Sequence, residues 1–247
     1  MPNEPVCMEA RGDIRIVTLN RPSKLNAADL AMQRLLLERF ASIEADQNTR
    51  AVVLTGSGRA FCAGGDLSLL RELAAGNQVL QEELSDINRE LLRCMLELHV
   101  PVIAAVNGPA VGFGAALLAL SDIVVIAEGA YISEPHVNYG LPASPACQLV
   151  WPHLMSRAVA KELLMSGRHV EADEALRLGL VNRVIAPGEL LSEALRIARD
   201  FVALPASGIA SIKREFNLPL VAQARHAAGW ETPGVLADDG TLPGSHR

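Results

Sequence analysis

The chain has 247 residues, of which 50% are hydrophobic, and its formal net charge is −6. This apolar fraction suits one large α/β domain, with or without a helical appendage, and it excludes an intrinsically disordered chain. The acidic balance argues against a general nucleic-acid binder, and an aromatic content of 4% argues against a surface for stacking bases.

Several features favour a cytoplasmic protein without a membrane or metal partner. The start, MPNEPVCMEARGD, is polar and acidic and does not resemble a signal peptide. The longest apolar stretch is broken by Ser121 and Asp122 and is too short to span a bilayer. The histidines and cysteines show no metal-ligand spacing. The four cysteines lie far apart, so we expect reduced thiols: Cys7, Cys62, Cys94 and Cys147.

The first half of the chain alternates strand and helix patterns. Short apolar or period-2 runs predict strands, and apolar residues three and four apart predict helices. We expect strands at 14–19, 51–55, 101–106, 122–127 and 130–133, and helices at 28–45, 78–98 and from about Gly112. Asn26 is expected to cap the first helix. Strands that alternate with helices imply crossover connections and parallel pairing.

The second half is mainly helical. Helices are expected at 156–166, 171–179, 187–204 and 206–217, with a short strand at 181–185. The last nineteen residues, Gly229–Arg247, hold four glycines and two prolines without apolar periodicity. We therefore divide the chain into a core domain at 1–190, a helical C-terminal region at 191–228 and a disordered tail at 229–247.

Two turns rich in small residues follow predicted parallel strands. One is Asn107-Gly-Pro-Ala-Val-Gly-Phe-Gly114, and the other is Gly58-Arg-Ala-Phe-Cys-Ala-Gly-Gly-Asp66. A dinucleotide fingerprint is disfavoured because Leu117 stands where its third glycine should be. Tight strand-to-helix turns would explain the glycines alone. The functional interpretation is that two backbone amides, one from each turn, polarise one carbonyl oxygen.

The order of these segments resembles the crotonase (enoyl-CoA hydratase/isomerase) superfamily, and the resemblance runs from about residue 12 to 217. The segments that carry it are Asn20-Arg-Pro-Ser-Lys-Leu-Asn-Ala27, Ala51-Val-Val-Leu-Thr-Gly56, Arg59-Ala-Phe-Cys-Ala-Gly-Gly-Asp-Leu67, Pro101-Val-Ile-Ala-Ala-Val-Asn-Gly108 and Ala175-Leu-Arg-Leu-Gly-Leu-Val-Asn-Arg-Val184. The resemblance implies a spiral of ββα units, a helical C-terminal trimerisation region, a homotrimer or homohexamer, and an acyl-CoA thioester substrate. It implies no cofactor beyond the CoA of the substrate.

The resemblance also implies roles for individual residues. The oxyanion amides fall on Gly65 and on Phe113, which replaces the family's usual glycine. Because the amides do this work, Phe113 narrows the space without abolishing the oxyanion hole. The CoA contacts fall near five residues: Lys24, Ala27, Ala63, Asp66 and Leu67.

Two positions depart from the hydratases of this family, which use two glutamates to activate and position water. Ala116 stands at the first glutamate position and His136 at the second, after Pro135. Alanine cannot transfer a proton, whereas imidazole gives or takes one near neutral pH. His136 is either the acid/base group or a loop histidine bound to the backbone. Glu128 and Glu134 are interpreted as solvated surface charges.

Other residues near these turns receive structural interpretations. Asp66 is expected to cap the following helix, and Cys62 is expected to be a small buried filler. The sequence therefore predicts an acyl-CoA enzyme that stabilises a thioester enolate. Double-bond isomerisation, C–C cleavage and thioester hydrolysis remain open, as do a divergent hydratase and a non-catalytic acyl-CoA-binding protein.

Overall fold

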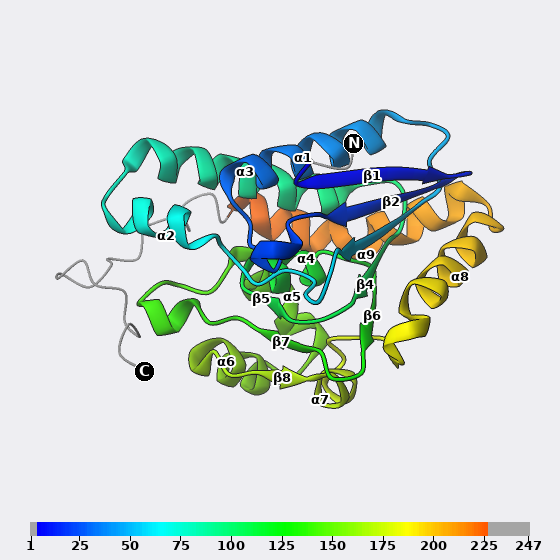
Figure 1. The fold of residues 1–247 in the computed structure, drawn as a ribbon. Helices are drawn as coiled ribbons and strands as arrows, with labels where there is room; N and C mark the ends of the chain where they lie inside the picture. Colours follow the sequence, from blue (N-terminus) through cyan, green and yellow to red (C-terminus); the bar gives the residue numbers. More distant parts are fainter. Residues whose placement is uncertain (1–3, 227–247) are drawn as a thin grey trace.

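The computed structural model describes residues 4–226, which form two β-sheets surrounded by helices (Figure 1). The larger sheet has the strand order β1-β2-β3-β4-β6-β9. Its strands are β1 (Val6–Arg11), β2 (Ile14–Leu19), β3 (Ala51–Gly56), β4 (Val102–Val106), β6 (Ile123–Ala127) and β9 (Arg183–Ile185). β1 and β2 are antiparallel, and each later neighbour pairs in parallel, as the crossover connections predicted.

The smaller sheet has the order β5-β7-β8, with β5 (Ala110–Val111), β7 (Tyr131–Ser133) and β8 (Val170–Glu171). β5 and β7 directly precede the segments that carry Phe113 and His136. Because β5 and β7 pair in parallel, with Val111 opposite Ser133, these two segments leave the sheet at the same edge. The smaller sheet therefore positions the predicted acid/base residue beside a predicted oxyanion turn.

Helices cover the sheets on several sides. They are α1 (Leu30–Ala45), α2 (Leu67–Ala74), α3 (Gln78–Glu97), α4 (Phe113–Ala119), α5 (Pro145–Leu154), α6 (Arg157–Ser166), α7 (Ala172–Leu178), α8 (Leu190–Val202) and α9 (Ala206–His226), with short 3-10 helices at η1 (Pro22–Lys24), η2 (His136–Tyr139) and η3 (Pro187–Glu189). α1 packs against α3 along the top of Figure 1, and α8 packs against β3 and β4. None of the helices in the described part of the chain combines the length and apolar character needed to cross a membrane.

The core lies between the larger sheet and its helices. Every residue of β4 is buried, as are the first four residues of β3. Near-continuous apolar strands are typical of parallel sheets covered on both faces. A buried lysine ties α9 to this core, because Lys213 Nζ lies 2.7 Å from Asp122 Oδ2 and 3.0 Å from the Val100 carbonyl oxygen.

Three expectations about local structure were wrong. The first helix begins at Leu30, and its cap is Asp29, whose side chain accepts from the Met32 amide at 2.8 Å. Asn26 cannot cap it, because its carboxamide is already bound inside the protein: it accepts from the Arg21 amide and donates to two carbonyl oxygens of residues 57 and 60.

The other two corrections concern the ends of the chain. β1 was not predicted, because all but one of its residues are at least partly exposed and no apolar alternation marks it. α9 extends past the expected end at residue 217 and through Pro219. Contacts with the rest of the protein outweigh the proline there: Asn217 donates to the Leu96 carbonyl at 2.9 Å, and Leu220 is buried. The tail predicted at 229–247 lies outside the described residues.

Candidate active site

The two small-residue turns lie side by side. The Val111 amide donates to the Cys62 carbonyl at 2.8 Å, and Cys62 also forms an isolated bridge with Ala110. A Cβ atom at Gly114 would lie 2.6 Å from that same carbonyl oxygen, so only glycine allows the two turns to approach this closely. The close approach brings the segments of Gly65 and Phe113 together.

Gly65 and Phe113 line one cavity of about 340 Å³. Within residues 4–226, no hydrogen bond uses the backbone N–H of either residue. Two donors at one cavity that are not engaged within the protein are what an oxyanion hole requires. The structure thus brings together the two residues that the resemblance assigned to this role.

Backbone bonds hold the segment around Gly65 on both sides. The Ala28 amide donates to the Gly64 carbonyl at 2.7 Å, and the Asp66 amide donates to the Ala28 carbonyl at 3.0 Å. Two residues before Gly65, the Ala63 amide donates to the Leu25 carbonyl at 3.0 Å. Gly65 lies between these bonds, so its backbone is held in place on both sides.

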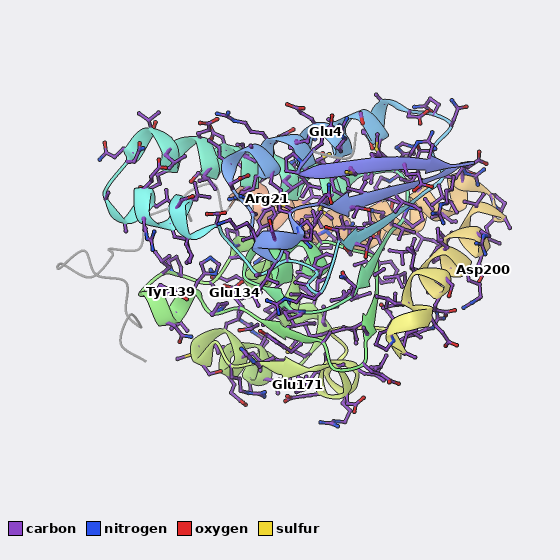
Figure 2. The ribbon with its side chains drawn as sticks, in the orientation of Figure 1. Glu4, Arg21, Glu134, Tyr139, Glu171 and Asp200 are labelled. Atoms are coloured by element: carbon purple, nitrogen blue, oxygen red, sulfur yellow. The ribbon has the colours of Figure 1, made fainter. Side chains whose placement is uncertain are left out.

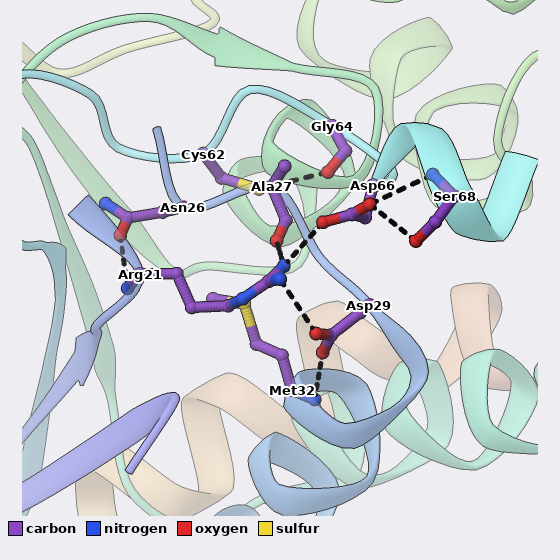
Figure 3. Close-up of polar contacts among 9 residues, drawn as sticks. All are labelled: Arg21, Asn26, Ala27, Asp29, Met32, Cys62, Gly64, Asp66 and Ser68. Carbon is purple, nitrogen blue, oxygen red and sulfur yellow. Dashed lines mark hydrogen bonds and ion pairs between the residues drawn. The ribbon is translucent and has the colours of Figure 1, made fainter. Parts of the chain in front are cut away.

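Arg21 organises the same region through its guanidinium group (Figure 3). It lies 3.0 Å from Asp66 and 2.9 Å from Asp29, and it also donates to the Ala27 carbonyl oxygen. Asp66 caps α2 as predicted, accepting from the amide and hydroxyl of Ser68. These Ser68 bonds, followed by Arg21, lower the pKa of Asp66. No local sequence pattern predicted this role of Arg21.

The residues predicted to contact CoA belong to the chain segments that this network and its backbone bonds join. Lys24 and Leu67 are exposed, while Ala27 and Ala63 are half-buried. The carboxylate of Asp66 binds Ser68 and Arg21, so it stabilises the local fold. Of these residues, none lines the cavity itself.

Ala116 and His136 both line the cavity beside Phe113. Gly112 separates the oxyanion turn from the imidazole ring: a Cβ atom there would lie 3.4 Å from His136 Cε1. Gly112 also has φ +51°, which side chains disfavour. The ring of His136 therefore lies against the turn that carries Phe113, and Ala116 provides no ionisable group one helical turn further on.

Glu134 binds His136 and is buried, so the prediction of a solvated carboxylate was wrong. Its Oε1 contacts His136 Nδ1, and its residue exposure is only 1%. Glu134 lies inward of Tyr139 in Figure 2. Its other oxygen, Oε2, has no hydrogen-bond partner among the described residues. Alternation from the buried Ile132 could have indicated that the side chain two positions later also points inward.

The thiols of Cys147 and Cys62 are unreactive because both are buried. Burial, reinforced by the nearby Glu134 charge, raises the pKa of Cys147. Burial also raises the pKa of Cys62 to about 12, which confirms the interpretation of this residue as a buried filler. Thiols with such high pKa values stay protonated near neutral pH, so neither is a nucleophile for a thioester.

The fold agrees with comparisons to known proteins. The model of the enoyl-CoA hydratase/isomerase family matches residues 9–231. The chain belongs to this family. It is 33% identical to a short-chain-enoyl-CoA hydratase from Clostridium acetobutylicum, over 86% of this chain and 80% of that protein.

Solved structures similar to this chain include proteins named as hydratases and as isomerases. An enoyl-CoA hydratase/isomerase from Mycobacterium paratuberculosis has a TM-score of 0.86 and 41% identity, covering 91% of this chain and 89% of that chain. A monofunctional enoyl-CoA isomerase from M. smegmatis has a TM-score of 0.73 and 28% identity, covering 88% and 94%. The chain is thus an acyl-CoA enzyme of crotonase fold, and its similarity spans both hydratases and isomerases.

Proposed function

We propose that this family member shifts the double bond of an enoyl-CoA thioester with a single acid/base group. The observation that carries the proposal is the composition of the cavity. Gly65 and Phe113, whose amides are unengaged among the described residues, line it beside one histidine, and Ala116 stands at the position expected for a second proton-transfer group. Water addition needs one group to activate water and a second to protonate the α carbon, whereas moving a double bond needs one base that returns the same proton.

The proposed reaction starts with a β,γ-unsaturated thioester whose carbonyl oxygen accepts from the amides of Gly65 and Phe113. His136 Nε2 removes a proton from the α carbon, and the electron pair of that C–H bond forms the enolate. The two amides stabilise the negative charge that develops on the oxygen. The imidazolium then returns the proton to the γ carbon, and the electrons move back to give the α,β-unsaturated thioester.

Glu134 is the positioning residue in this proposal. Its carboxylate accepts from Nδ1–H of His136, which leaves Nε2 unprotonated and ready to act as the base. It also stabilises the imidazolium that forms after proton abstraction. The burial of Glu134 excludes water from this contact and fixes the orientation of the ring.

Hydration is the second candidate, because the relative from C. acetobutylicum is named a short-chain-enoyl-CoA hydratase. His136 could activate water, but the cavity presents Ala116 where a second ionisable group would be needed. We expect hydration of a short α,β-enoyl-CoA to be slow for this reason.

The deciding experiment compares four activities of the wild-type protein. A β,γ-enoyl-CoA should be isomerised faster than crotonyl-CoA is hydrated, and β-keto- and malonyl-type esters test C–C cleavage and hydrolysis. Brisk hydration without isomerisation would overturn the proposal in favour of a hydratase. Tight acyl-CoA binding without turnover of any ester would make the protein a non-catalytic binder.

We further propose that CoA lies over the surface formed by Lys24, Ala27, Ala63, Asp66 and Leu67. Two of these side chains are accessible to a ligand, which supports this position. Lys24 is exposed, and Leu67 has an exposed fraction of 62%. A homotrimer or homohexamer also remains a prediction, supported by the exposed apolar side chains Ile212 and Phe216 on α9. Light scattering at micromolar concentration tests it, and a monomer mass would contradict it.

A further inference from the structure

The cavity beside the oxyanion turns has two chemically different walls. Helices α2 and α4 and the loop after η2 contribute mostly leucine, alanine and proline side chains. The wall formed by α1 and α3 also carries four amide or hydroxyl side chains: Gln33, Gln81, Ser85 and Asn88. A pocket built for a plain hydrocarbon chain has no need of this second wall.

The polar residues of α3 form a stripe that follows helical spacing. Positions 81, 85 and 88 lie on the face that also presents Leu84 and Leu92 to the cavity. Residues three, four and seven apart share one side of a helix. The stripe therefore belongs to the cavity wall, and Gln33 continues it on the neighbouring helix α1.

Among the described residues, the side chains of this wall leave hydrogen-bonding capacity unused. Gln33 is only 2% exposed, and its carboxamide oxygen has no hydrogen-bond partner among the described residues. Within residues 4–226, no side-chain hydrogen bond involves Gln81, Ser85 or Asn88 either. Gln148, elsewhere in the same cavity, differs because it donates to the Ala143 carbonyl at 2.5 Å.

An unsubstituted alkyl chain would displace water from these groups and leave them unpaired, which disfavours binding. A substituent that donates or accepts a hydrogen bond would satisfy them. The wall favours an uncharged substituent, because amides and a hydroxyl both donate and accept. Arg89, which also lines the cavity, lies 3.1 Å from Asp86 in an ion pair.

We propose that the preferred acyl chain carries a hydroxyl or carbonyl group that hydrogen-bonds Gln33 and the polar stripe of α3. This inference rests on the proposed function, since it describes the acyl group of the same thioester. It makes the α1–α3 wall a specificity determinant that separates oxygenated from plain acyl chains.

The test compares a medium-chain β,γ-enoyl-CoA with matched esters that carry a hydroxyl, a carbonyl or a carboxylate along the chain. We expect kcat/KM for the better of the hydroxyl and carbonyl esters to exceed that of the plain ester by roughly 10–100-fold in the wild type. Gln33→Met and Asn88→Leu keep similar size and remove hydrogen bonding, so each should lower this ratio toward one. Leu84→Met is the matched control on α3 and should leave the ratio unchanged.

A binding measurement separates this inference from the proposed reaction. Calorimetry with saturated acyl-CoA esters, which cannot isomerise, should show tighter binding of the hydroxyl or carbonyl ester even if no ester is turned over. Equal or tighter binding of the plain ester would overturn the inference, and so would a preference for the carboxylate. A ratio that Gln33→Met and Asn88→Leu leave intact would overturn it as well.

Discussion

The turns that carry Gly65 and Phe113 differ from the cavity wall that carries Ala116 and His136 in which atoms are available for chemistry. The turns present backbone N–H groups, held by bonds such as those of Ala28 to the residues around Gly65. The wall presents side chains, among them that of His136, whose ring contacts Glu134. One region is defined by backbone shape and the other by residue identity.

This difference explains how a family can keep a fold and change its chemistry. In a turn that acts through its backbone, a side chain can be exchanged while the amide remains. An exchange at the position of Ala116 or His136 would instead remove or add a proton-transfer group outright. Substitutions that separate amide from side chain, or base from its positioning partner, therefore test the comparison directly.

The largest expected effect is that of His136→Ala. General acid–base assistance contributes about 10²–10⁴-fold, so turnover of a β,γ-enoyl-CoA should fall by that factor. CoA binding should stay nearly intact, because His136 acts on the acyl part. Steady-state kinetics and calorimetry measure the two quantities, with the exposed His153→Ala as the matched control. Loss of stability without loss of rate would show that the imidazole is structural.

Gly65→Pro comes next, because it removes one oxyanion donor. The loss of one such donor costs about 3 kcal/mol in the transition state, or roughly 10²–10³-fold in kcat. Gly65→Ala is the control: it keeps the N–H, and its Cβ would meet only the flexible end of Leu70 at 3.3 Å. A folded proline variant with full activity would contradict the assignment, and circular dichroism verifies folding.

Glu134→Gln should have a smaller effect, on the order of 10-fold in kcat with little change in KM, since hydrogen bonds to charged groups contribute about 1.5–3 kcal/mol. The amide can still accept from His136 Nδ1–H but cannot stabilise an imidazolium by charge. ¹⁵N NMR of the imidazole should show Nδ1 protonated in the neutral wild type. Nε2 protonated instead would contradict the positioning role, and the exposed Glu128→Gln should change neither readout.

Asp66→Ala should lower the free energy of unfolding by about 1 kcal/mol through loss of the α2 cap. The pKa of Asp66 is lowered in the folded state, so its charge stabilises the protein above the unfolded pKa. That contribution disappears as pH falls through the lower folded pKa. Urea titrations should therefore show a smaller difference from wild type at strongly acidic pH than at pH 7. The exposed Asp200→Ala should change stability little at either pH.

The sequence predicted the features that depend on backbone pattern. Apolar runs located the parallel strands from Ile14 to Ala127, and small residues located the turns of Gly65 and Phe113. The cap at Asp29 was missed because Asn26 and Asp29 have similar local preferences. Only the distant carbonyls of residues 57 and 60, which bind the Asn26 side chain, decide between them.

The sequence could not predict the groups whose role depends on contacts far along the chain. A glutamate is usually found at the surface, so its residue type alone predicts exposure. The burial of Glu134 follows from Cys147 and the rest of the core packing over it. The polar wall of α3 has the pattern of an amphipathic helix, so Asn88 resembles a solvated position. Its place at a cavity follows from the packing of α3 against α1 and α2.

The guanidinium of Arg21 joins the caps of two helices, since Asp29 begins α1 and Asp66 begins α2. A lysine could not replace it, because one ammonium lacks the planar fork that reaches both carboxylates and the Ala27 carbonyl. Any displacement of α2 that preserves these bonds must pivot about its first turn. The end that carries Leu73 would then swing and resize the cavity, while Gly65, which adjoins the fixed cap, keeps its place in the lining.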